Sequence, residues 1–187
     1  LPLGMIVYFG RVCRFKPLSW LVKIYISIMR GTPLMLQLLI WYFGPFYLWG
    51  MNIGGYKFTA IILGCSLNYA AYFAEIYRSG IESIPTGQYE AAQLLGYTRV
   101  QTFFKIVLPQ VVKIVLPSVT NEVITLVKDT SLVYSVSYIE MFAVAKQIAA
   151  AQTTVVPFFI AGIFYYVFNY VVAWVMELFE KKLNYYH

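Results

Sequence analysis

The chain has 187 residues, of which 60% are hydrophobic, 19% aromatic and only 12% charged. About a quarter of the residues in a soluble globular chain are normally charged, so this composition excludes an ordinary water-soluble domain. The net charge of +6 comes without a concentrated basic stripe, which argues against nucleic acid as a partner. The two cysteines, Cys13 and Cys65, form no CxxC or Cys/His cluster, so neither a disulfide framework nor a metal site is predicted.

Long uncharged stretches predict membrane-spanning helices. Residues 31–56, 58–74 and 147–176 contain no Asp, Glu, Lys or Arg, and about 20 apolar residues cross the hydrocarbon core. Residues 1–9 are apolar but too short to cross, so we interpret them as the end of a first span whose start is absent. The sequence therefore predicts an all-α membrane protein with five spans, the first of them truncated. The other spans are expected at about 18–44, 57–80, 110–127 and 155–176, and a more polar segment at 128–152 is expected to fold partly across or along the bundle.

Basic residues predict which side of the membrane each loop faces. Lys and Arg are enriched in cytoplasmic loops, and three basic groups fall on one side if the helices alternate. The opposite loop, at 44–56, has no Lys or Arg. The C-terminus is therefore predicted to be cytoplasmic, with the chain in a bacterial-type plasma (inner) membrane. The three groups are Arg11, Arg14 and Lys16; Arg78, Arg99 and Lys105; and Lys181 and Lys182.

A polar segment between two spans, YEAAQLLGYTRVQTFFKIVLP, predicts a helix–glycine–helix element. We expect Gly87 to be the N-cap, which places Glu90 at the third helical position, where its carboxylate reaches the cap and the positive helix end. Gly96 is expected to end this helix in the left-handed conformation. Thr98 and Gln101 form a T-x-x-Q capping box for the following helix.

The exposed face of this element could serve either of two purposes. Ala91 and Ala92 leave the first helix smooth, so another protein could approach its backbone closely. An interfacial hairpin that merely connects two spans would have the same local chemistry, and the spacing alone does not separate the two interpretations.

The residues of the segment resemble the EAA loop of ABC importer permeases. Glu90, Ala91 and Ala92 are followed by Gly96, four residues after the second alanine, and then by Ile-x-Leu-Pro ending at Pro109. Other motifs, in the same order along nearly the whole chain, are similar to the polar-amino-acid (histidine/glutamine/arginine-type) branch of that family. The segment SVSYIEMFAVAKQ departs from the family pattern, which leaves the exact substrate open. The other motifs are RGTPL at 30–34 with Gln37, NYAAYFAEIYR at 68–78, Asn121-Glu122, and KDTSL at 128–132.

This resemblance implies a type I ABC importer permease-like bundle, with residues 1–187 as one permease domain and a coupling loop at about 81–105. In this family the loop forms a coupling helix that sits in a groove of a cytoplasmic P-loop ATPase. ATP and Mg would then be bound by a partner ATPase dimer, and this chain would hold no cofactor. The other expected partners are a second permease subunit (identical or a sister permease), an extracytoplasmic amino-acid-binding protein, and membrane lipid. The expected coupling residues are Glu90, Ala91, Ala92, Gly96, Leu108 and Pro109.

Polar residues inside the spans are candidates for binding the solute, because ionisable groups are costly in a membrane. Asn68, Tyr72 and Glu75 recur at spacings of four and three, which places them on one helical face. An amino-acid zwitterion needs an anion for its ammonium, which Glu75 or Glu140 could supply. Its carboxylate needs donors, which Asn68, Tyr72, Thr130 or Ser131 could supply. The expected substrate-binding residues are Asn68, Tyr72, Glu75, Ser131 and Glu140.

Structural roles remain open for the acidic residues. Glu75 and Arg78 could lie at the cytoplasmic boundary, with the arginine reaching the interface. Glu122 could pair with Lys128 or Lys113 to hold the bundle together.

Two other functional classes compete with an ABC permease. An enzyme is disfavoured because the only histidine is the C-terminal His187, the only aspartate is Asp129, and no GxxxxGK[ST] phosphate loop occurs. A stand-alone secondary carrier or channel for a small polar solute is the alternative. Such carriers often contain internal repeats, and none is evident here.

Overall fold

The computed structural model describes residues 1–183, and this part of the chain consists of helices joined by short connections, without a β-strand. His187 lies outside the described residues. Three helices are long and apolar enough to span a membrane: α4 (Lys57–Glu82), the nearly continuous helix Arg99–Val136, and α9 (Val156–Leu183). The helix pair α2 (Lys16–Gly31) and α3 (Leu34–Trp49) could count as a fourth, broken span. The first predicted span corresponds to α1 (Pro2–Val12), an apolar helix of 11 residues.

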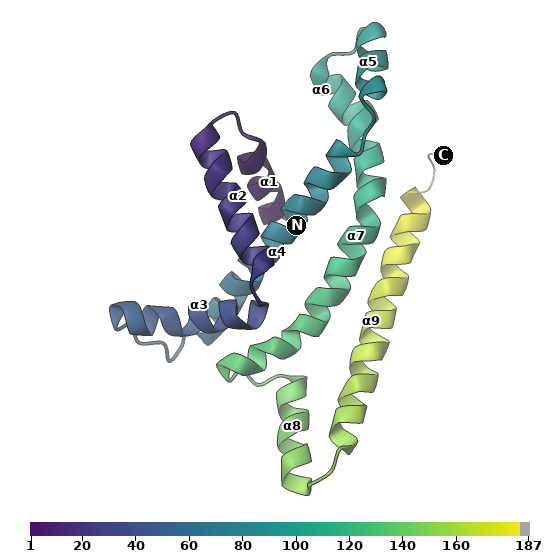
Figure 1. Cartoon of the computed structure of the whole chain (residues 1–187). Helices are drawn as coiled ribbons and strands as arrows, with labels where there is room; N and C mark the ends of the chain where they lie inside the picture. Colours follow the sequence, from purple (N-terminus) through teal and green to yellow (C-terminus); the bar gives the residue numbers. More distant parts are fainter. Residues whose placement is uncertain (184–187) are drawn as a thin grey trace.

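The predicted single helix at 18–44 is wrong, because the structure breaks it between α2 and α3 with a bend of 110°. Thr32 has extended backbone angles and Pro33 follows it. A proline disfavours the helical conformation of the residue before it, so the break falls at this Thr-Pro pair. In Figure 1, α3 lies across the direction of α2 and extends sideways from the other helices.

The helix α4 is the centre of the fold. It packs against α1, α2, α3 and α7 (Leu108–Asp129). Small residues allow this close packing: an added Cβ at Gly4 of α1 would lie 2.5 Å from Phe73 Cβ, and one at Gly80 would lie 2.3 Å from Val115 Cγ1. Ala71 and Ala74 are fully buried in the same helix. Close packing of small residues is a normal way to join helices in lipid, where there is little hydrophobic drive between them.

The C-terminal half forms two arms: in Figure 1 the first descends from α6 (Arg99–Thr102) through α7, and the second ascends along α9. The descending arm starts with α6, a π-helical turn (Phe103–Val107) and α7, and it ends with a 3₁₀ helix (Thr130–Val136). The segment predicted to fold across or along the bundle contains this 3₁₀ helix and α8 (Met141–Gln152), which packs against α9. The remaining element, α5 (Thr86–Leu94), stands with α6 at the top of Figure 1, beyond the end of α4.

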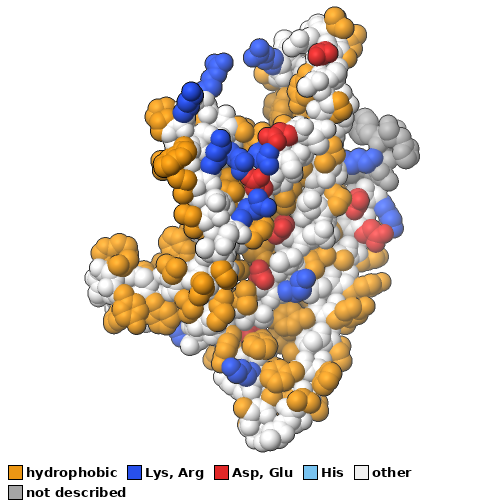
Figure 2. Space-filling model, in the orientation of Figure 1, with side chains coloured by type: hydrophobic (Ala, Val, Ile, Leu, Met, Phe, Trp, Pro, Cys, Tyr) orange, Lys and Arg blue, Asp and Glu red, His pale blue; other side chains and the backbone are white. Residues whose placement is uncertain are grey.

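The surface is mostly apolar, and its charges are unevenly placed. Figure 2 shows blue Lys and Arg side chains concentrated in the upper half of the view, at the end of the molecule that carries the α1–α2 turn and α5. Exposed large hydrophobic side chains cover α3 and α9. This distribution agrees with the basic side predicted from the sequence.

Candidate functional site

The α5–α6 hairpin (residues 86–102) has two of the three local motifs predicted from the sequence. Gly96 has a φ of +78°, and the amides of Gly96 and Tyr97 donate to the carbonyls of Gln93 and Ala92 at 2.9 and 3.0 Å. These two bonds form a Schellman motif, which satisfies carbonyls at the end of α5. The predicted capping box of Thr98 and Gln101 is also present, with both reciprocal hydrogen bonds.

The predicted start of α5 is wrong. The N-cap is Pro85, no side chain caps the helix, and Gly87 is already its second residue. Glu90 therefore lies beyond the first turn and cannot complete a capping box. Proline fixes its own φ, which suits the residue that enters a helix, and this preference outweighs the flexibility of the glycine.

The exposed surface of the hairpin differs from the one expected. Ala92 is buried, whereas Glu90 and Ala91 are exposed, so the alanine pair does not form one smooth outer face. Leu94 and Leu95, at the C-terminal end of α5, are 90% and 75% exposed. Neither leucine was among the predicted coupling residues. Their position immediately before Gly96, at the tip of a short helix, was the available signal.

The hairpin is attached to the start of α7. Gln88 of α5 and Gln110 of α7 exchange hydrogen bonds through their side-chain amides. Pro109 and Leu108 are half-buried at this joint, and Pro109 lines a hollow of about 470 Å³ beside Gln88 and Gln110. A movement of α5 can therefore be transmitted to α7 through direct side-chain contact.

A polar cavity of about 280 Å³ lies deeper in the fold, between the α2–α3 break, α4 and the C-terminal part of α7. It contains two of the five predicted substrate residues, Asn68 and Tyr72. Glu122 and Asp129 add two carboxyl groups on one face of α7. Neither acid was among the predicted substrate-binding residues, although both lie in motifs that carry the family resemblance. The lining consists of Thr32, Pro33, Leu34, Asn68, Tyr69, Tyr72, Glu122, Thr125, Asp129 and Leu132.

Asn68 and Gln37 hold the α2–α3 break against α4. Both side chains are buried, at 4% and 6% exposure. The Asn68 amide donates to the Met29 carbonyl and to Gln37 Oε1, each at 3.0 Å, and the Gln37 amide donates to the same carbonyl at 3.0 Å and to Thr32 Oγ1 at 2.7 Å. A broken helix leaves carbonyls unpaired, and these amides satisfy one of them. Both donor positions of Asn68 are thus occupied within the protein.

A second cross-link closes the cavity on its other side. The hydroxyl of Tyr69 on α4 donates to Asp129 Oδ2 on α7 at 2.7 Å. This is a charge-assisted hydrogen bond, which is stronger than one between neutral groups. The cavity is therefore bounded by two polar contacts that join three elements.

Glu75 lies beside the cavity and not in its lining. Its carboxylate pairs with Arg11 of α1, with Arg78 at 2.9 Å and with Arg30 of α2 at 3.7 Å, and its side chain is 12% exposed. Arg78 also pairs with Glu82. The Glu75–Arg78 pair is therefore part of a larger ionic cluster that joins α1, α2 and α4.

Ser131 and Glu140 are also outside the cavity. The Ser131 hydroxyl donates to the Lys128 carbonyl at 2.8 Å. Glu140 is the N-cap of α8, where its two oxygens accept from the amides of Phe142 and Ala143 at 2.6 Å. The Tyr165 hydroxyl of α9 also donates to this carboxylate, at 3.2 Å. Glu140 therefore stabilises the start of α8 and its contact with α9.

Comparison with known proteins agrees with this architecture. Residues 1–185 match the family described as binding-protein-dependent transport system inner membrane component. The chain belongs to this family of ABC importer permeases. It is 38% identical to the arginine transport system permease protein ArtQ of Bacillus subtilis (strain 168), over 97% of this chain and 83% of that protein. It is 34% identical to the L-cystine transport system permease protein TcyB of the same organism, over 98% of this chain and 78% of that protein.

Solved structures lead to the same family. The permease matches a chain from a crystal structure of an amino acid ABC transporter with histidines, with a TM-score of 0.86 and 32% identity, over 96% of this chain and 83% of that one. The methionine ABC transporter MetNI in an inward-facing conformation has a TM-score of 0.75 at 20% identity, which shows a shared fold. The family resemblance, the all-α permease fold and the assignment as a non-enzymatic subunit of an amino-acid importer are confirmed. Membership of this family excludes the alternative of a stand-alone secondary carrier or channel.

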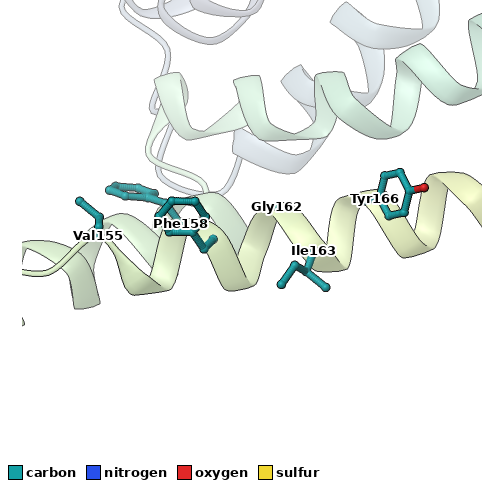
Figure 3. Close-up of a pocket in the computed structure, with 6 residues that line it drawn as sticks. Val155, Phe158, Gly162, Ile163 and Tyr166 are labelled. Carbon is teal, nitrogen blue, oxygen red and sulfur yellow. The ribbon is translucent and has the colours of Figure 1, made fainter.

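Two other hollows of the permease, one along α9 and one between α8 and α9, are mostly apolar. Figure 3 shows one of about 400 Å³, with Val155, Phe158, Gly162, Ile163 and Tyr166 spaced along the start of α9. All of its lining residues come from this single helix or the residue before it. It provides little chemistry for a zwitterion, so the polar cavity is the better candidate for the solute.

Proposed function

We propose that this permease subunit transmits ATP hydrolysis on a separate P-loop ATPase dimer, which binds ATP and Mg, to a polar amino acid held in the cavity between α2, α4 and α7. A second permease subunit, identical or a sister permease, would complete the path. An extracytoplasmic amino-acid-binding protein would deliver the solute. The α5–α6 hairpin and the C-terminus would then both face the cytoplasm.

The proposal that an ATPase docks on this chain rests on the tip of the α5–α6 hairpin. α5 has nine residues, far fewer than a membrane span requires, and it projects beyond the end of α4 in Figure 1. Leu94 and Leu95 are nevertheless almost fully exposed there. Exposed apolar residues at a polar end of a protein favour a protein partner. Gly96 and the Thr98–Gln101 box hold this tip in a fixed shape, as docking requires.

The chemistry of the cavity supports an amino acid as the solute. Glu122 and Asp129 lie on one side of it, and either can pair with an ammonium group. Glu75 was predicted for this role, but three arginines already surround it, so the cavity acids are better placed. Contacts to α7 connect the cavity to the hairpin, because α7 carries Glu122 and Asp129 and also Gln110, which binds Gln88 of α5.

Docking is tested by co-purification of the permease with its ATPase from membranes, followed by ligand-stimulated ATP hydrolysis in lipid. Leu95→Glu should greatly reduce both, because it places a charge on the apolar tip. Phe15→Glu is the matched control: Phe15 is 64% exposed, lies on the same predicted side and is outside the hairpin. Normal co-purification and stimulation of the Leu95 variant would contradict the docking role.

A further inference from the structure

The cavity has many acceptors but few free donors for a carboxylate. Four of its polar lining side chains already donate inside the protein: Asn68 as described, Tyr69 to Asp129, Thr32 to the Ile28 carbonyl at 2.8 Å, and Thr125 to the Asn121 carbonyl at 2.9 Å. The other hydroxyls predicted for this role, Thr130 and Ser131, donate to the carbonyls of Val127 and Lys128. Tyr72 adds a single neutral hydroxyl to the lining. A zwitterion with two carboxylates nearby and no cation for its own carboxylate would bind poorly, because a desolvated charge needs a partner.

Arg30 is the cation placed to supply these donors. It lies in the last turn of α2, two residues before Thr32, and its guanidinium carbon is 5.4 Å from the centroid of the Tyr72 ring. Tyr72 lines the cavity. A guanidinium carries its N–H donors in one plane, from which two of them can bind a carboxylate in bidentate fashion.

Arg30 is also the most loosely held arginine of the ionic cluster. Its nearest contact with Glu75 is 3.7 Å, whereas Arg78 contacts Glu75 at 2.9 Å and also pairs with Glu82. The side chain of Arg30 is 44% exposed, compared with 20% for Arg11. Arg30 can therefore leave Glu75 for a ligand while the other two arginines keep that carboxylate compensated.

We propose that Arg30 binds the α-carboxylate of the transported amino acid, while Glu122 and Asp129 accept its ammonium. This assignment rests on the proposed function of the cavity. It makes the cavity selective for an intact α-amino acid over an amine that lacks the carboxylate. The main rival for the same role is Lys128, which precedes Asp129 at the end of α7.

The test measures equilibrium binding to the permease–ATPase complex in lipid nanodiscs, without the binding protein, so that the permease alone selects the ligand. The probes are L-arginine and agmatine, which carry the same guanidinium but differ in the carboxylate; L-glutamine and 4-aminobutanamide form a second pair.

Arg30→Met should weaken binding of both amino acids at least about tenfold, the effect of losing a hydrogen bond to a charged group. Binding of both amines should change less than about twofold, which also shows that the cavity is still folded. The affinity of Arg30→Lys for the two amino acids should lie between those of the wild type and Arg30→Met, because lysine keeps the charge but loses the planar fork.

Lys23→Met is the matched control, since Lys23 is an exposed cation on the same helix, and it should bind all four probes normally. Equal losses for the amino acids and the amines in Arg30→Met would assign Arg30 a structural role and overturn the proposal. A selective loss of amino-acid binding in Lys128→Met, with Arg30→Met unaffected, would also overturn it. If the wild type binds neither amino acid, the cavity proposal fails together with the role of Arg30. If wild-type binding survives Arg30→Met unchanged, only the role of Arg30 fails.

Discussion

Replacing Gly96 with alanine should loosen the end of α5 through backbone strain alone. A Cβ added at Gly96 meets no atom within 4 Å, so no steric clash contributes. The φ of +78° is the whole cost, about 1–2 kcal/mol for a residue with a Cβ. A change of this size shifts the ratio of closed to open hairpin by roughly 5- to 30-fold. Gly87→Ala is the matched variant: its Cβ also has open space, but its φ is not positive, and alanine there should be neutral or stabilise by about 0.4–1 kcal/mol.

Hydrogen exchange at the amides of residues 96 and 97 reports directly on this motif, since both donate to carbonyls of α5. Exchange should accelerate in Gly96→Ala and remain at the wild-type rate in Gly87→Ala. Ligand-stimulated ATP hydrolysis in the reconstituted complex should likewise fall in Gly96→Ala and stay at the wild-type rate in Gly87→Ala. Gly96→Asn should be milder, because asparagine tolerates the left-handed conformation, and Gly96→Val should be more severe. Equal exchange and equal stimulation in Gly96→Ala and Gly87→Ala would refute the argument.

Three other predictions concern the bundle. Gly80→Ala should destabilise the permease by about 1–3 kcal/mol in thermal unfolding, because its Cβ would lie 2.3 Å from Val115 Cγ1, and Val115→Ala should restore much of the loss; additive losses would contradict this contact. Glu75→Gln should lower stability by up to about 3 kcal/mol, since it removes the carboxylate that Arg11, Arg30 and Arg78 share, and of these only Arg78 keeps a second ion pair within residues 1–183, with Glu82. A normal melting temperature with weakened uptake would instead support the substrate role predicted from the sequence. In a double-mutant cycle, Gln37→Leu and Asn68→Leu should be coupled by about 0.5–3 kcal/mol; zero coupling would show that the two amides act independently.

Local sequence patterns correctly predicted the turn between α5 and α6, although not the start of α5. A glycine after a short helical pattern and a T-x-x-Q box each depend on only a few neighbouring residues, and both motifs are present at Gly96 and Thr98. The helix break at Thr32–Pro33 also depends only on neighbouring residues, but it was missed because the long apolar stretch around it predicted one continuous helix. In that case the proline overrode the hydrophobic periodicity.

The candidate site was harder to predict because its chemistry depends on what each helix faces. Helical spacing correctly placed Asn68, Tyr72 and Glu75 on neighbouring turns of α4, but it could not show that Asn68 meets Gln37 or that Glu75 meets three arginines. Those partners come from helices far away in the sequence. Asp129 was hidden for the same reason, since only the packing of α4 on α7 brings it to Tyr69.

The uneven burial of the spans has a consequence for how the chain enters the membrane during synthesis. α4 is the least apolar of the three long helices, and half of its most apolar window is covered by other parts of the protein, against 6% for α9. A helix with buried polar groups gains little from lipid alone, whereas an apolar one partitions readily on its own. We therefore expect α4 to leave the insertion machinery only in company with α1 to α3, while α9 can enter the bilayer independently and dock afterwards.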